Sequence, residues 1–552
     1  MSPALPSTAF VGGHVYLGNG EAAPGGVAVR EGRIVVSGDD ATVLEAAGSG
    51  AERVDLRGGL VSPGFGDSHL HPMIAGLQLG QCSLDGYQSA DECLAAIAAY
   101  AVEHPELPWI VGGGWSLAEF PDGPPHRSVL DRIVPDRPVF LRERGFHGAW
   151  VNSRALELAG ITADTPDPAD GRIKHDADGE PSGMLHEGAA YLVTRVAPPL
   201  DRGALYDGLM RGQERCLSLG ITQWQDALLR LFDGGGPDGL DPYADALEKG
   251  TLLARVTGAL WWDRERGLEQ IDDLLARDAR MSGHETRFRA NAVKIMVDGV
   301  AENHTASLSR PYRDGCGHDT ENFGISFLDR EVLKDLVAAV DALDLQAHFH
   351  ALGDQAVTDS LDAVEHARRS NPGSRARHTL AHLQMVRPAD VPRFAELDAV
   401  ANLQPLWARL DDQMTELTMP FIDPDLARWQ YPFMDLHRAG ATLAAGSDWP
   451  VSSANPLEGM HVAVTRTPEH SPAGTDPFLP EQRLPLGVIW DAYTSGVAFL
   501  NEREDEVGTI RPGMLADLVV LDRNPFTEPV HEIADTQVQS TWIDGQCVHR
   551  RD

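Results

Sequence analysis

LVSPGFGDSHLH, residues 60–71, is the stretch that decides the fold of this 552-residue chain. Its apolar, glycine-punctuated first part predicts a buried strand. His69 and His71 stand at the carboxyl end of that strand, and because they lie two residues apart, their side chains leave the same face. Two neutral imidazoles side by side are a common half-site for a divalent transition metal. The spacing alone is weak, so the prediction depends on the residues at the other strand ends.

Strand-like runs alternate with helical stretches from this point to about residue 500, which is the pattern of parallel α/β folds. Eight strands can be drawn, and that number indicates a (β/α)8 barrel of the TIM type. The predicted strands end near His69, Asp226, Trp262, Asp298, His350, His382, Pro405 and Asp448. In such a barrel the active site lies at the carboxyl ends of the strands.

Residue types that bind metals gather at these strand ends. Four histidines, a lysine and an aspartate could converge there on one or two metal ions, namely His69, His71, Lys294, His350, His382 and Asp448. His348 shares a strand face with His350, so periodicity does not exclude it as the ligand. His378 precedes the body of its strand and is interpreted as a supporting or structural residue.

The two ends of the chain carry short alternating strands with turns, the pattern of antiparallel sheets. Neither end can close a sheet by itself, so residues 1–60 and 501–552 are predicted to form one small β-sandwich. Residues 61–80 hold the first barrel strand, and residues 201–500 hold the rest of the catalytic barrel. The interval 81–200 is too long for one crossover and predicts a large insertion covering the barrel mouth.

The amino-acid composition indicates which partners and which cellular compartment to expect. The formal net charge of −36 disfavours nucleic acid and anionic membranes as partners, so a small-molecule substrate is expected. No segment has the length of a membrane span, and the start of the chain does not resemble a signal peptide. The five cysteines are scattered without a Cys-x-x-Cys pair, which suits a reducing cytoplasm. A homodimer is one assembly that these features allow.

Several motifs resemble the amidohydrolase superfamily of metal-dependent hydrolases over nearly the whole chain. They are PGFGDSHLH at 63–71, GSD at 446–448 and GTIRPGMLADLVVLD at 508–522. The predicted insertion is similar to the branch that includes N-substituted formamide deformylases. That similarity is carried by GGW at 113–115, FHGAWVNSRAL at 146–156 and, in the barrel, DGVAE at 298–302.

The resemblance implies roles for the residues at the strand ends. His69, His71 and Asp448 would hold one divalent metal, and His350 and His382 would hold a second, with zinc the expected ion. A carboxylated Lys294 would bridge the two, which requires a neutral amine and hence a depressed pKa. Asp448 would also be the catalytic acid–base group, passing a proton from water to the leaving amine.

Three residues are candidates for substrate binding: Trp115, His147 and Trp449. Trp115 follows a glycine run, His147 lies in the predicted insertion and could donate to a carbonyl oxygen, and Trp449 follows Asp448 at the barrel mouth. Glu187 is a further candidate on the substrate side, although its position is equally typical of a surface residue.

These observations predict a hydrolase that cleaves the carbon–nitrogen bond of an N-substituted amide or formamide with metal-activated hydroxide. The reaction class follows from the metal-binding residues, and the formamide follows only from the resemblance. A cyclic imide, carbamate or aminoacyl substrate suits the same site. A non-catalytic metal-binding barrel is the alternative outside the enzymes. A glycosidase with two carboxylates is disfavoured, because that chemistry needs no metal.

Overall fold

The structure is a computed structural model that describes residues 7–87, 89–120, 123, 125–168, 171–230, 238–472 and 474–551. Its centre is a sheet of eight parallel strands. The strands are β6 (Phe65–Leu70), β13 (Ile221–Asp226), β14 (Arg255–Trp261), β15 (Phe288–Met296), β16 (Gln346–Ala351), β17 (Thr379–His382), β18 (Val400–Leu403) and β19 (Leu443–Ala445). In this sheet β6 lies at one edge and β19 at the other. Hydrogen bonds between residues at or just after the end of β6 and those that follow β19 bring the two edges together. Asp448 N–H donates to His69 O at 2.7 Å, and His71 N–H donates to Trp449 O at 2.9 Å.

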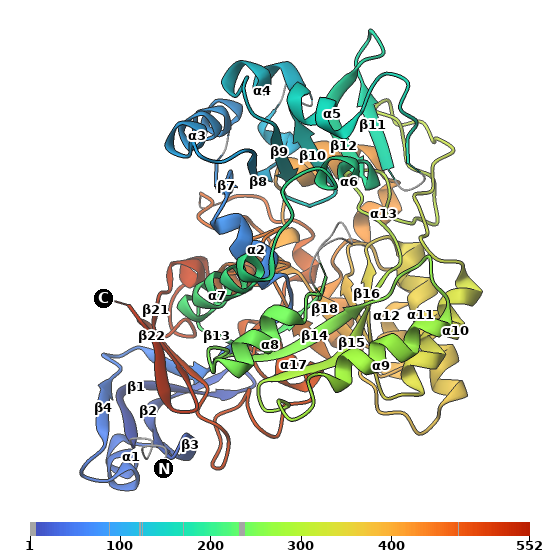
Figure 1. Cartoon of the computed structure of the whole chain (residues 1–552). Coiled ribbons are helices and arrows are strands. Elements are labelled where there is room, and N and C mark those ends of the chain that lie inside the picture. Colours follow the sequence, from blue (N-terminus) through green and yellow to red (C-terminus); the bar gives the residue numbers. More distant parts are fainter. Residues whose placement is uncertain are drawn as a thin grey trace.

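The eight strand ends agree with the sequence-based prediction, and the TIM-like barrel is confirmed. The strands are almost wholly buried because helices cover the outer face of the sheet (Figure 1). The main helices are α2 (Pro72–Leu79), α7 (Arg202–Ser218), α8 (Asp241–Glu248), α9 (Ile271–Ala279), α10 (Arg330–Asp341), α11 (Asp354–Ser370), α12 (Val391–Glu396), α14 (Phe433–Arg438), α15 (Pro456–Thr465), α16 (Leu486–Ala492) and α17 (Ser495–Leu500).

A second sheet combines strands from both chain ends, as Figure 1 shows in blue and red at the lower left. Its strands are β1 (Thr8–Gly18), β2 (Glu21–Arg30), β3 (Arg33–Gly38), β4 (Glu52–Asp55), β5 (Leu60–Pro63), β20 (Leu518–Leu521), β21 (Val538–Ile543) and β22 (Gln546–Arg550). The pairings form one continuous hydrogen-bonded sheet, so the two facing layers of the predicted sandwich stay a prediction. β5 continues through Gly64 directly into β6 of the barrel.

The third sheet belongs to the segment between β6 and β13, and it lies above the barrel in Figure 1. Its strands are β7 (Cys82–Ser83), β8 (Ile110–Trp115), β9 (Val139–Glu143), β10 (Gly148–Val151), β11 (Gly171–His175) and β12 (Pro181–Glu187). Its helices are α3 (Ala90–Glu103), α4 (Arg127–Ile133), α5 (Ser153–Ala159) and α6 (Tyr191–Thr194). Among the described residues, no helix combines the length and apolar character needed to cross a bilayer.

Candidate active site

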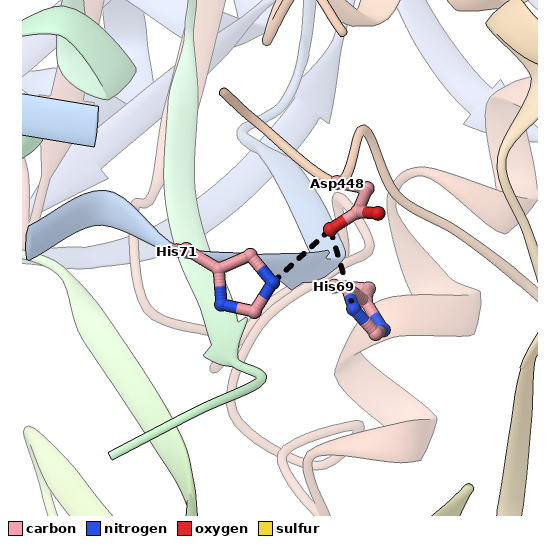
Figure 2. Close-up of side chains that lie close together, drawn as sticks. All are labelled: His69, His71 and Asp448. Carbon is pink, nitrogen blue, oxygen red and sulfur yellow. Dashed lines mark ion pairs between the residues drawn. The ribbon is translucent and has the colours of Figure 1, made fainter. Parts of the chain in front are cut away.

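Two histidines at the end of β6 and an aspartate from the turn after β19 form a compact group (Figure 2). His71 Nε2 lies 3.1 Å from Asp448 Oδ1, and His69 Nε2 lies 3.4 Å from the same oxygen. One possible ligand atom from each of the three lies within 4.8 Å of the others. All three side chains are buried. Two imidazole nitrogens and a carboxylate oxygen at this spacing suit a divalent transition metal.

A buried carboxylate connects the two segments that carry this group. Asp67 accepts hydrogen bonds from the His69 N–H at 2.9 Å, the Ser447 N–H at 3.1 Å and the Ser447 hydroxyl at 2.6 Å. Burial outweighs these bonds and raises the pKa of Asp67 to about 7. Asp448 follows with a φ of +56°, a strained conformation for an L-residue of the kind that gathers at functional sites.

Lys294 lies beside these ligand candidates on β15. Its Nζ is 3.4 Å from His69 Nε2, and the side chain is buried. Burial lowers the pKa of Lys294 to about 8, although the Asp448 carboxylate opposes the shift. A much larger fraction of this amine than of an ordinary lysine is therefore neutral near pH 7, and carboxylation requires the neutral form.

His350 at the end of β16 and His382 at the end of β17 lie next to this group, with the His382 ring centroid 4.7 Å from that of His69. The ring centroids of His350 and His382 are 4.5 Å apart, and His382 Nδ1 is 3.9 Å from Asp448 Oδ2. His382 stacks on Trp407 at 5.2 Å and has a φ of +80°. Burial is the main reason that the pKa of His69, His350 and His382 lies well below the ordinary value. All three are neutral at pH 7, the state in which imidazole binds a metal.

Several polar atoms in this group are buried without a hydrogen-bond partner among the described residues. They are His350 Nδ1 and both ring nitrogens of His382, while Asp448 Oδ1 has, within the described part of the chain, only the ion-pair contacts to His69 and His71 given above. Leaving such atoms unpaired costs free energy, of order 1–3 kcal/mol each, unless something else satisfies them. Nitrogen and oxygen lone pairs that converge in this way fit a bound divalent cation.

His348 has a different environment from His350, although both belong to β16. His348 Nε2 lies 2.7 Å from His69 Nδ1, and its Nδ1 lies 3.0 Å from Gln225 Oε1. His350 lines the cavity above the strand ends, whereas His348 is fully buried one pleat deeper. His348 therefore orients His69, the kind of contact that fixes the ring of a metal-binding histidine. His378 contacts Asp341 at 2.8 Å and accepts from the Ala347 N–H, which is a structural position.

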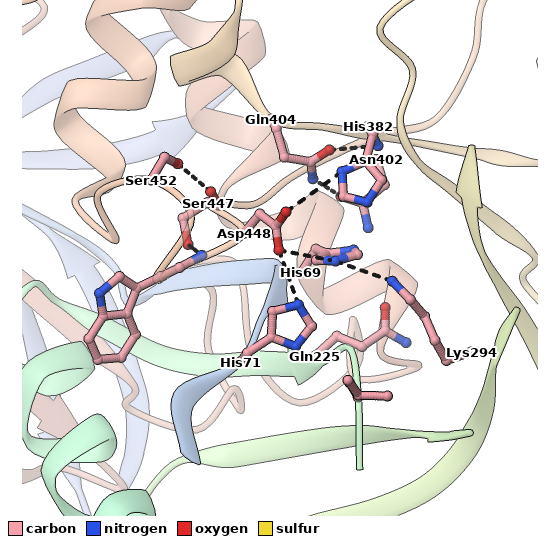
Figure 3. A network of polar contacts seen from close by, with 12 residues as sticks. His69, His71, Gln225, Lys294, His382, Asn402, Gln404, Ser447, Asp448 and Ser452 are labelled. Atoms are coloured by element: carbon pink, nitrogen blue, oxygen red, sulfur yellow. Dashed lines mark hydrogen bonds and ion pairs between the residues drawn. The ribbon is translucent and has the colours of Figure 1, made fainter. Parts of the chain in front are cut away.

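A polar network beside the site connects β6, β17 and β18 (Figure 3). Asn402 donates to Ser68 O at 2.9 Å, and Gln404 donates to Asn402 Oδ1 at 2.9 Å. Gln404 in turn accepts from the His382 N–H at 2.6 Å. The sequence analysis missed this network, because a lone amide within a short apolar strand resembles any buried polar residue. The only signal was the pair Asn402 and Gln404, spaced so that both point into the barrel.

A cavity of about 640 Å³ opens above the strand ends. It is lined by residues of the barrel, such as His350, Asp448 and Trp449, and by residues of the segment between β6 and β13, such as His147. This volume is within the range of small-molecule sites. The structure thus places two of the three substrate-binding candidates, His147 and Trp449, at the cavity.

His147 carries a charge at the cavity wall. Its Nδ1 lies 2.9 and 3.0 Å from the two carboxylate oxygens of Glu187. Burial opposes protonation, but Glu187, with Glu302 and Glu143 nearby, outweighs it and raises the pKa of His147 to about 9. His147 is therefore an imidazolium at neutral pH and can donate to an oxygen of a ligand.

Trp115 does not occupy the predicted position. It is fully buried, its Nε1 donates to Leu141 O at 3.0 Å, and its ring packs edge-on against Trp150. It is not among the residues that line the cavity. The preceding glycines serve close packing: a Cβ on Gly112 would come within 2.0 Å of Cys82 O in the neighbouring strand β7. The glycine run therefore marks a tightly paired strand, and Trp115 is a core residue.

Comparison with known proteins agrees with this geometry. The amidohydrolase family model matches residues 52–549. "Protein LONG AFTER FAR-RED 3" of Arabidopsis thaliana is 31% identical, with 95% of this chain and 88% of that protein covered. N-substituted formamide deformylase of Arthrobacter pascens is 29% identical, with 95% of each chain covered.

Among solved structures, a metal-dependent hydrolase of Pyrococcus horikoshii OT3 superposes with a TM-score of 0.73 at 26% identity. The match covers 95% of this chain and 99% of that one. The barrel, the ligand group at its strand ends and the extent of the family match lead to one conclusion: the chain belongs to the amidohydrolase family of metal-dependent hydrolases.

Proposed function

We propose that this protein hydrolyses the carbon–nitrogen bond of an N-substituted amide or formamide. The convergence of His69, His71 and Asp448 beneath a cavity of small-molecule size is the observation that carries the proposal. The relative from Arthrobacter pascens, named for N-substituted formamides, supports the choice of substrate class.

The proposed metal site has two parts. His69, His71 and Asp448 would hold one ion, His350 and His382 would hold a second, and a carboxylated Lys294 would contribute a ligand to both. Zinc suits this set of nitrogen and oxygen donors. When bound, such an ion supplies a Lewis acid that polarises a carbonyl oxygen and acidifies a water molecule. In carboxylation, the Lys294 Nζ lone pair forms a bond to the carbon of CO2 and the nitrogen loses a proton to solvent.

Asp448 is the proposed proton carrier. Its carboxylate lies at the floor of the cavity and accepts a proton from the attacking water. It then delivers that proton to the nitrogen of the breaking bond, so that the amine leaves in neutral form. His147 and Trp449 would contact the substrate: the imidazolium donates to its carbonyl oxygen, and the indole packs against an apolar substituent.

We also propose a cellular compartment for the protein. The five cysteines form no disulfide among the described residues, and Cys316 and Cys547 are exposed. Free exposed thiols support a reducing compartment, for which the cytoplasm is the proposed site.

The test is substitution of the ligand group combined with a substrate panel. His69→Ala and His71→Ala should lose bound metal and turnover, because a catalytic metal is held by only three or four protein ligands. His318→Ala is the matched control, since that ring is 78% exposed. The panel should contain formamides, amides, carbamates and cyclic imides. Full metal content and activity in either ligand variant would contradict the metal site, and turnover confined to carbamates or imides would replace the proposed substrate class.

A further inference from the structure

Glu187 and His147 are held together by their backbones as well as by their side chains. The Glu187 N–H donates to His147 O at 2.8 Å, while its carboxylate accepts from His147 Nδ1. Phe146, just before His147, has a φ of +63°, and Glu187 has a φ of +49° with a ψ of −129°. These are unfavourable conformations for L-residues, and they persist only where surrounding contacts over-determine them.

This arrangement leaves one edge of the His147 ring for a ligand. Nδ1 is committed to Glu187, so Nε2 is the nitrogen that remains. The ring lines the cavity, and its centroid lies 6.3 Å from that of His350. His147 and Asp448 both line this cavity, so a ligand in it can contact the two side chains.

We propose that Glu187 is a positioning residue, which acts through His147 by holding Nε2 toward the cavity so that it donates to the carbonyl oxygen of the substrate. The inference rests on the proposed function, since it deepens the role of the same site. It also gives a function to the segment between β6 and β13, which supplies both residues and places His147 in the cavity wall.

A second histidine–carboxylate pair in the same segment provides a comparison. His126 Nε2 lies 3.5 Å from Asp176 Oδ2, and the two side chains are 39% and 29% exposed. This pair does not line the cavity. If an ion pair serves folding alone, its removal should leave the kinetics unchanged, as we expect for this pair.

The variant Glu187→Gly distinguishes a positioning role of Glu187 from a role in stability, because the two roles predict different effects on kcat/KM and on the melting temperature. Glycine adopts the observed backbone conformation without strain, which offsets part of the stability lost with the ion pair, so the variant should fold and melt within a few degrees of wild type. The loss of the carboxylate should nevertheless lower kcat/KM by on the order of 10- to 100-fold, the usual effect of removing a group that orients a functional side chain. Glu187→Gln, which keeps an acceptor, should recover part of this loss. Asp176→Asn should retain wild-type kinetics.

A double-variant cycle tests whether Glu187 acts through His147. His147→Ala and the pair His147→Ala with Glu187→Gly should show the same kcat/KM, because Glu187 has nothing left to orient. Multiplicative losses in the double variant would overturn the proposal, as would wild-type kinetics in Glu187→Gly. Metal content should stay equal in all of these proteins.

A readout independent of turnover comes from nitrogen-15 NMR of the histidine rings. The His147 signals are identified by their absence in His147→Ala, and in wild type they should show a protonated, hydrogen-bonded Nδ1. In Glu187→Gly they should shift, and unchanged signals would overturn the proposal. If no member of the panel is turned over, the proposed function fails, while this comparison still decides whether Glu187 orients His147.

Discussion

The two carboxylate oxygens of Asp448 face different neighbours. Oδ1 lies near His69 and His71, and Oδ2 lies 3.9 Å from His382 Nδ1. Asp448→Asn keeps the size and one oxygen but cannot accept a proton at neutral pH. We expect kcat to fall by a factor on the order of 10² or more, with a smaller effect on KM. Steady-state kinetics at matched metal occupancy is the measurement, and a kcat within a few-fold of wild type would exclude Asp448 from proton transfer.

In the proposed site, the chemical state of Lys294 decides the number of metal ions. If it is carboxylated, Lys294→Ala should lose metal, and bicarbonate or a small carboxylic acid should restore part of the activity. Carbon-13 NMR after growth or incubation with labelled bicarbonate should show a carbamate signal in wild type that the variant lacks. An unmodified ammonium group in a metal-loaded crystal structure would leave a one-metal enzyme.

At the scale of elements, the strand ends were predictable because each barrel strand is a short buried run with a polar residue at or close to its carboxyl end. The sequence could therefore place His69, His350 and Asp448 at one end of the barrel before any coordinates were known. It could not separate His348 from His350, because depth within a barrel depends on strand tilt and stagger, which periodicity does not contain. The prediction that Trp115 binds substrate is wrong because the same run of glycines can occur in a flexible loop or in a tightly paired strand.

The packing of α2 against α7 offers a prediction at this scale. A Cβ on Gly76 would lie 1.8 Å from Gly208 O, so Gly76→Ala must separate the two helices. We expect the free energy of unfolding to fall by about 1–3 kcal/mol or more, and metal retention to weaken because α2 begins directly after His71. Chemical denaturation and metal analysis are the measurements. Gly50→Ala is the control, since its Cβ would meet no atom within 4 Å, and an equally small effect in both variants would contradict the packing argument.

At the scale of the whole molecule, a buried ion pair joins the chain-end sheet to the barrel. Arg255 at the start of β14 donates to both oxygens of Asp517, at 2.7 and 3.0 Å, and to Asp544 at 2.5 Å. Asp517→Ala would leave the guanidinium buried with one carboxylate fewer, so we expect a loss of about 3–5 kcal/mol in unfolding free energy. Asp505→Ala, at a side chain that is 97% exposed, should stay within about 0.5 kcal/mol of wild type. Similar unfolding curves for the two variants would show that the junction contributes little.

The pairing of β5 with β20 can form only after nearly the whole chain has been synthesised. Leu60 and Leu521 are partners in one sheet although more than 450 residues separate them, and β5 runs directly into the strand that ends in His69. At translation rates of 5–20 residues per second, the edge of β5 waits roughly 20–90 s for its neighbour to leave the ribosome. An unpaired apolar edge is prone to aggregation during that interval. Compact intermediates or chaperones that cover this edge would therefore protect the nascent chain until its last strands emerge.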